Sequence, residues 1–162
     1  MPDRWPWWRN RDFLYFLDVK SGFKQRLTAG RLSTNLQSIS PDGKRLIFSR
    51  SVPDFSERPY SKTQWFILNL IDFSLDSLFT TAWSGSARWS PDGRKILFTG
   101  GPSMFGNIGS NVPEGMIPNE YDTQAYIFNL DDKEITPITR DFNPSISQVF
   151  CISSVKYILI FN

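Results

Sequence analysis

The sequence predicts an all-β protein built from repeated four-stranded antiparallel sheets, and two observations carry this prediction. First, Ser-Pro-Asp-Gly followed by a basic pair and an apolar run occurs twice, as residues 40–48 and residues 90–98. Second, aromatic residues make up 15% of the chain and include 14 Phe. Aromatic side chains are enriched in strands. With 40% hydrophobic and 21% charged residues, the composition is that of a globular protein.

The repeated motif predicts a hairpin with a tight turn. Proline presets the backbone for the second position of a turn, and glycine takes the left-handed conformation. We therefore expect paired strands over residues 36–40 and 45–49, and again over residues 87–90 and 95–99. The second strand of each pair is apolar on both faces (Leu-Ile-Phe and Ile-Leu-Phe). A strand with one wet face would alternate, so these strands should be covered from both sides.

A second pattern lies between the copies of the first. An apolar strand, a polar turn and a shorter strand follow each other three times, starting at Phe13, Gln64 and Gln124, and two of these units close on Thr28 and Thr139. The two patterns together give four antiparallel strands per unit with a period near fifty residues. That period is typical of a β-propeller blade.

The repeat gives a partial propeller of about three blades. We expect a half blade over 12–28, a blade over 36–81, a blade over 87–139 with an insertion at 99–123, and a half blade over 148–161. Together they would form a single incomplete domain over 1–162. Propellers typically have at least four blades, and the chain stops directly after an apolar strand. The sequence therefore predicts a fragment.

Composition excludes several classes of function. The net charge is +2 without a basic face, which argues against nucleic-acid binding. No apolar run reaches the roughly 18 residues of a membrane span, and the N-terminus lacks the apolar core of a secretory signal. The chain has no histidine and one cysteine, Cys151. This removes histidine-dependent triads, histidine-based zinc sites and an internal disulfide, so we predict neither a metal nor another cofactor.

The stretches SPDGKRLIFSRS, RWSPDGRKILFTGGP and YIFNLDDKEITPIT resemble the TolB-type (PD40 or WD40-like) propeller repeat. They are also similar to the N-terminal propeller of bacterial dipeptidyl-peptidase and prolyl-oligopeptidase-type serine peptidases. In that family the propeller limits access of peptides to a hydrolase domain, whose Gly-x-Ser-x-Gly motif is absent here. The resemblance implies a non-catalytic propeller fragment. Members are often periplasmic or exported, but the sequence leaves the compartment open.

Candidate site residues fall into two groups. The resemblance implies that insertion residues shape a peptide route, and the acidic or aromatic candidates there are Glu114, Glu120 and Tyr121; the alternative is an ordinary surface loop. The second group has a structural role in the two repeated turns and comprises Ser40, Pro41, Asp42, Gly43, Ser90, Pro91, Asp92 and Gly93. Turn capping explains the two aspartates better than calcium binding does.

Three functional hypotheses remain open. The first is a peptidase-associated propeller fragment that gates substrates or contacts another domain. The second is a stand-alone TolB-like scaffold that binds a protein or peptide partner. The third is a homodimer in which two chains complete each other's open blade edges and close one ring.

Overall fold

The computed structural model describes residues 10–109, 113, 115–142, 145–153 and 156–161. These residues are all-β apart from one short 3-10 helix, η2 (Gly106–Gly109). The strands are β1 (Tyr15–Leu17), β2 (Lys24–Arg26), β3 (Asn35–Ile39), β4 (Arg45–Pro53), β5 (Ser61–Asn69), β6 (Leu75–Thr81), β7 (Gly85–Trp89), β8 (Lys95–Gly100), β9 (Gln124–Asn129), β10 (Ile135–Pro137), β11 (Ile146–Ser153) and β12 (Lys156–Phe161).

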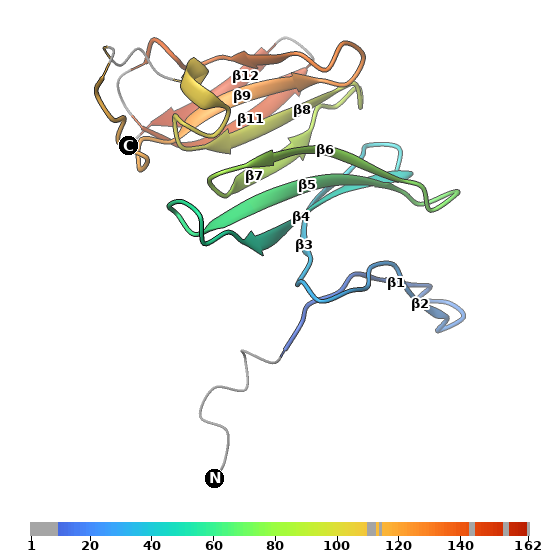
Figure 1. The fold of residues 1–162 in the computed structure, drawn as a ribbon. Coiled ribbons are helices and arrows are strands. Elements are labelled where there is room, and N and C mark those ends of the chain that lie inside the picture. Colours follow the sequence, from blue (N-terminus) through green and yellow to red (C-terminus); the bar gives the residue numbers. More distant parts are fainter. Residues whose placement is uncertain (1–9, 110–112, 114, 143–144, 154–155, 162) are drawn as a thin grey trace.

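The strands form four antiparallel sheets that follow one another along the chain as successive layers (Figure 1). Two sheets have four strands, in the orders β3-β4-β5-β6 and β7-β8-β9-β10. Before and after them lie two-stranded sheets, β1-β2 and β11-β12. Each sheet is a meander in which sequential strands pair. This architecture is a partial β-propeller, and it confirms the fold class that the repeat predicts.

The two Ser-Pro-Asp-Gly turns repeat the same hydrogen bonds. The Ser40 hydroxyl donates to Asp42 at 2.5 Å, and the amide of Arg45 donates back to that hydroxyl at 2.9 Å. Ser90 and Asp92 repeat this arrangement, with a hydroxyl–carboxylate distance of 2.6 Å. Gly43 and Gly93 both have φ of 69°, which other residues rarely adopt. The turn therefore sets the same register for the residues next to it in both hairpins, as Ile39 pairs with Leu46 and Trp89 with Ile96.

Side chains of the second strands enter different cores in alternation. In β4, Leu46 and Phe48 pack against the preceding β1-β2 sheet, whereas Ile47 packs against the following sheet. In β8, Ile96 and Phe98 face the preceding sheet in the same way, and Leu97 faces β11-β12. All six side chains are at most 4% exposed. Successive strand residues point to opposite faces, so a doubly covered strand must be apolar throughout.

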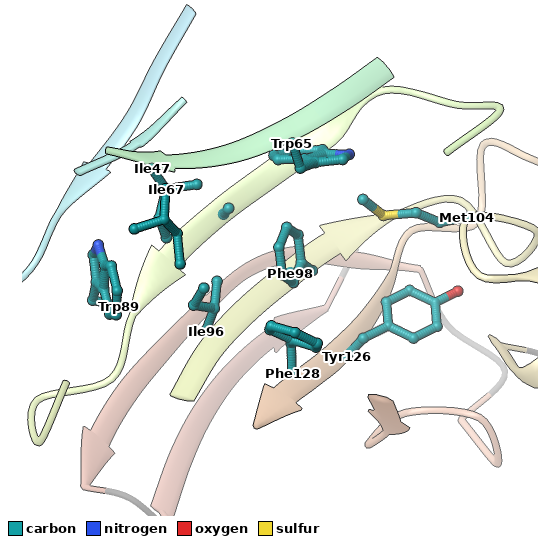
Figure 2. Close-up of a cluster of buried hydrophobic side chains, with 10 residues drawn as sticks. Ile47, Trp65, Ile67, Trp89, Ile96, Phe98, Met104, Tyr126 and Phe128 are labelled. Carbon is teal, nitrogen blue, oxygen red and sulfur yellow. The ribbon is translucent and has the colours of Figure 1, made fainter. Parts of the chain in front are cut away.

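The largest core fills the space between the two complete sheets (Figure 2). Trp65 from β5 and Phe98 from β8 meet edge to face, with ring centroids 5.0 Å apart. Phe79 from β6 lies 5.2 Å from Phe98 and 5.4 Å from Phe128. Edge-to-face aromatic pairs are favourable beyond the area they bury. This aromatic cluster holds the two sheets together as neighbouring blades.

Polar contacts also join the two sheets, and they involve β3, β4, β7 and the second repeated turn. Gln37 bridges them, since its amide nitrogen donates to Ser49 Oγ and its amide oxygen accepts from the Ala87 backbone N–H. The Arg45 guanidinium lies 4.5 Å from the centre of the Trp89 ring. It also donates to the Gly93 carbonyl at 2.9 Å. The repeated turn of one blade is thus attached to the second strand of the blade before it.

We predict that Phe98→Ala destabilises the chain by about 3–5 kcal/mol, the range for deleting a buried aromatic side chain. Phe98 is 0% exposed and makes edge-to-face contacts with several rings. Urea unfolding followed by tryptophan fluorescence measures the change. Phe150→Ala is the control, because Phe150 is 41% exposed and its loss should cost far less. Equal losses for the two variants would contradict the packing described above.

We expect the aspartates of the repeated turns to make a contribution to the stability of the fold that is lost at acid pH. Hydrogen bonding from the Ser90 hydroxyl, and secondarily from the Arg94 amide, lowers the pKa of Asp92 below its ordinary value. A lowered folded-state pKa stabilises the fold above the unfolded-state pKa, and this stabilisation disappears as pH falls through the folded-state pKa. Asp92→Asn should therefore lower the urea midpoint at pH 7 and have a smaller effect below pH about 3, given an unfolded-state pKa near 3.9.

The control for this experiment is Asp76→Asn, which changes an exposed aspartate within β6 and outside the repeated turns. Its effect on the urea midpoint should be small at both pH values. An Asp92→Asn effect that is equally large at pH 7 and pH 3 would argue against a role for the carboxylate charge.

Candidate functional site at the loop end of the sheets

The meander topology separates two ends of the stacked sheets. At one end, called the turn end, lie the short turns that join the first two strands and the last two strands of each sheet, such as residues 40–44 and 130–134. At the other end, called the loop end, lie residues 54–60, residues 101–123 and the connections between successive sheets. The longest loops gather at the loop end. Loops on a rigid scaffold are the usual location of binding residues.

A groove of about 320 Å³ opens between the two complete sheets. Its lining is mostly polar and includes Asn35, Gln37, Ser49, Thr63, Trp83 and Gly85. Asn35, Gln37, Ser49 and Thr63 come from the first three strands of the earlier sheet. Trp83 lies in the connection between β6 and β7, and Gly85 begins β7. Such a surface offers hydrogen-bond donors and acceptors beside one large aromatic ring.

The same positions line a smaller groove of about 80 Å³ between the β7-β10 sheet and β11. The pairing of β3 with β4 places Asn35 opposite Ser49, and the pairing of β7 with β8 places Ser86 opposite Thr99. Ser86 and Thr99 line the smaller groove, as Asn35 and Ser49 line the larger one. Polar side chains therefore recur at the loop end of the first and second strands of both sheets. Sequence reasoning did not identify these positions, although their recurrence in the repeat was a detectable signal.

The 54–60 loop carries an ion-pair cluster beside the larger groove. Lys62 Nζ lies 2.9 Å from Asp54 and 2.8 Å from Glu57. Hydrogen bonding to Glu57 and then to Asp54 raises the pKa of Lys62 to about 12. The Ser56 hydroxyl and then Lys62 lower the pKa of Asp54 to about 2. Lys62 and Asp54 therefore stay charged at neutral pH, and the two ion pairs tie Lys62 of β5 to the loop.

The insertion is anchored to the sheet by Tyr126. This side chain is 0% exposed, and its hydroxyl donates toward the carbonyls of Gly101 and Pro102 at 2.8 and 3.1 Å. Burial, and then the charge of Glu120, raises the pKa of Tyr126 well above its ordinary value. Gly109, in η2, packs so closely on Tyr126 that a Cβ would clash with its hydroxyl. The start of the insertion is therefore fixed on the third strand of its own sheet.

Met104 connects the insertion to the larger groove. Its side chain is 3% exposed and lies against Gly85 and Gly100. A Cβ on Gly85 would clash with the Thr99 carbonyl and crowd Met104. Gly85 also lines the groove. The buried base of the insertion thus packs against a residue at the edge of the groove.

The predicted ligand residues lie in different surroundings. Glu120 folds back on the base of the insertion, where Oε2 lies 3.5 Å from the Ser103 amide nitrogen. Tyr121 is 90% exposed, and its carbonyl accepts a hydrogen bond from Ser145 Oγ at 3.3 Å. Glu114 lies outside the described residues. A ligand role for these three residues stays a prediction.

Exposed apolar side chains mark the rest of the insertion. Ile117 is 90% exposed and Met116 is 64% exposed, close in sequence to Tyr121. All three side chains belong to the 101–123 insertion, which therefore exposes apolar groups at the loop end.

Within the described residues, no group of three or more His, Cys, Asp or Glu side chains is placed to hold a metal ion. Burial, and then the charge of Asp92, raises the pKa of the Cys151 thiol, which keeps it protonated. In the same part of the chain, no helix has the length and hydrophobicity to cross a membrane.

We predict that Tyr126→Phe destabilises the fold by about 1–3 kcal/mol, because it leaves buried carbonyls without their donor. The insertion should also become more susceptible to limited proteolysis, while the 54–60 loop should be unaffected. Mass spectrometry of the first cleavage products measures both effects. Tyr60→Phe is the matched control, since Tyr60 is 51% exposed in the 54–60 loop. Unchanged cleavage of the insertion in Tyr126→Phe would contradict the anchoring role.

Comparison with known proteins gives similarity at the level of structure alone. No family model matches the sequence, and no curated protein matches it. Among solved structures, TolB from Acinetobacter baumannii is similar with a TM-score of 0.55 and 19% identity, over 91% of this chain and 34% of that protein. The propeller domain of the trilobed protease from Pyrococcus furiosus gives 0.51 and 17% identity, over 91% of this chain and 48% of the other.

An acylaminoacyl peptidase, in complex with a chloromethyl ketone, gives a TM-score of 0.51 and 13% identity over 91% of this chain and 27% of the peptidase. The chain thus spans about a third of the TolB structure and less than half of the propeller domain. At these identities the similarity shows the fold. The chain has the fold of part of a TolB-like β-propeller, as found in TolB and in the propeller domains of peptidases.

Proposed function

We propose that residues 1–162 form a single incomplete propeller domain with a non-catalytic function, and that its loop end contacts a protein or peptide. The observation that supports this proposal is the presence of two kinds of contact group at the loop end. A polar groove of about 320 Å³ opens there, and the insertion, whose Met104 packs against Gly85 of the groove, carries exposed apolar side chains. Extended peptides need both features, since their backbone requires hydrogen-bond partners and their side chains require apolar contacts.

The structural neighbours support two versions of this proposal. In a peptidase-like protein, the surface would select or gate peptides for a separate hydrolase domain. In a TolB-like protein, the same surface would bind a protein partner as a scaffold. Both versions place recognition at the loop end and require no reacting group in this chain.

The test is a binding measurement with peptides selected from a random library against the purified chain. Trp83→Ala removes the aromatic ring that lines the groove, and Tyr121→Ala removes an exposed ring of the insertion. Each should weaken binding at least tenfold, which corresponds to about 1.4 kcal/mol. Fluorescence anisotropy with a labelled peptide measures the affinity.

Ile71→Ala is the matched control, because Ile71 is an exposed apolar residue (67%) at the turn end. It should leave peptide affinity unchanged. Peptides that bind as tightly to Trp83→Ala and Tyr121→Ala as to the original chain would refute the loop-end assignment. Hydrolysis of the peptides by the purified chain would refute the non-catalytic assignment.

A further inference from the structure

The described structure has a two-stranded sheet at each end. One of these sheets contains the strands that the other would need to become a four-stranded sheet. A complete sheet has four strands, whereas β1-β2 and β11-β12 have two each. The β1-β2 pair corresponds to the third and fourth strands of a complete sheet, and β11-β12 corresponds to the first and second. In a complete sheet, the second strand pairs with the third. The corresponding edges here are the edge of β12 away from β11 and the edge of β1 away from β2.

Hydrogen bonding around Asp18 establishes which strand β1 represents. The side chains of Asn69 and Asn129, at the ends of β5 and β9, each accept a bond from the backbone amide two residues later. Asp18, directly after β1, accepts the same bond from Lys20. Their own amides also donate to the carbonyl five residues later in all three cases. Asp18 is thus the counterpart of Asn69 and Asn129, and β1 is a third strand.

Packing establishes the alignment of β12. In β4, Leu46 and Phe48 face the preceding sheet. In β12, Tyr157 and Leu159 pack against the core shared with the preceding sheet. Tyr157 pairs with Cys151 in β11 as Ile96 pairs with Trp89 and Leu46 with Ile39, the last ladder pair before the repeated turn, so we align Tyr157 with Leu46. Lys156 then corresponds to the basic residue that begins each second strand, Arg45 or Lys95.

Both complete sheets pair these positions in the same register. Arg45 lies opposite Asn69, and Lys95 lies opposite Asn129. Applied to the incomplete sheets, this register places Lys156 opposite Asp18. In the complete sheets a basic residue lies opposite an asparagine. In the proposed pairing the basic Lys156 would instead lie opposite the acidic Asp18. Opposite charges facing each other across strands stabilise the pairing.

We propose that two copies of the chain pair β12 of one with β1 of the other in this register, with Lys156 of each facing Asp18 of the second copy. We call each β12–β1 pairing between the two copies a joint. Two-fold symmetry creates two such joints, and at each joint a two-stranded sheet of one copy and a two-stranded sheet of the other form one four-stranded sheet. The product is a closed ring of six four-stranded sheets. This interface lies on the sheet edges and not on the loop-end surface, so its failure leaves the proposed function unaffected.

The side chains on these edges support a joint. Ile158 and Phe16 would be neighbours, and each is about half exposed in the single chain. Leu17 is likewise 57% exposed, on the face opposite that of Phe16. With six such side chains per joint, the buried area would be on the order of 1,200 Å² over both joints, the lower bound of specific interfaces. The six are Tyr15, Phe16, Leu17, Ile158, Ile160 and Phe161.

The first test is the mass of the purified chain by multi-angle light scattering. The proposal expects a dimer, with twice the monomer mass of 18.7 kDa. A folded monomer at micromolar concentration would overturn it, and so would an open series of larger oligomers, because the two-fold joint closes. Lys156→Asp places like charges opposite each other at both joints. It should weaken the dimer at least tenfold while circular dichroism stays that of a β protein.

The second test fixes the register by disulfide cross-linking in a Cys151→Ser background. Cysteines at Phe16 and Ile158 would lie opposite each other across the joint and should form a covalent dimer on mild oxidation. The control pairs the Ile158 cysteine with one at Leu17, which points to the other face of the sheet. A covalent dimer of comparable yield in the control, or none in the Phe16–Ile158 variant, would overturn the proposed register.

Discussion

Double coverage of the second strand in each sheet is the constraint on which the structure depends. In β8, Ile96 and Phe98 enter one core, and Leu97 between them enters another. Shifting the strand by one residue would exchange these faces and place every one of its side chains in the wrong core. The register of this strand therefore decides whether three successive sheets can pack at once. Its apolar sequence follows from the need to satisfy two cores together.

The repeated turn meets this constraint locally. The serine hydroxyl, the aspartate and the left-handed glycine fix where the hairpin reverses, so the following strand begins at a defined residue. Arg45 then links one blade to the carbonyl of Gly93 in the turn of the next. Local turn chemistry and contacts between blades thus specify the same register. Agreement between such levels is expected of sequences that specify one fold.

Most of the fold could be predicted from the sequence because the repeat combines turn chemistry with a simple period. Contacts that the period does not encode could not be predicted. Residue 37 bulges out of β3, since Leu36 and Ser38 pair with adjacent residues of β4. Its side chain, freed from the ladder, joins the two sheets. Likewise, the role of Tyr126 depends on carbonyls 24 and 25 residues away in sequence. No local pattern encodes a contact of that kind.

The same constraint limits where polar side chains can lie. Cores on both faces require apolar side chains along the middle of the second strand of each sheet, whereas the strand ends and the loops can carry polar groups. At the turn end, the hydrogen bonds of the repeat engage many of these groups, and a groove of about 320 Å³ opens beside Arg45, Asp76 and Lys133. At the loop end, Thr63 and Thr99 line grooves and the insertion adds exposed apolar groups. The packing that fixes the blades thus leaves the groups that can contact other molecules at the two ends of the sheets.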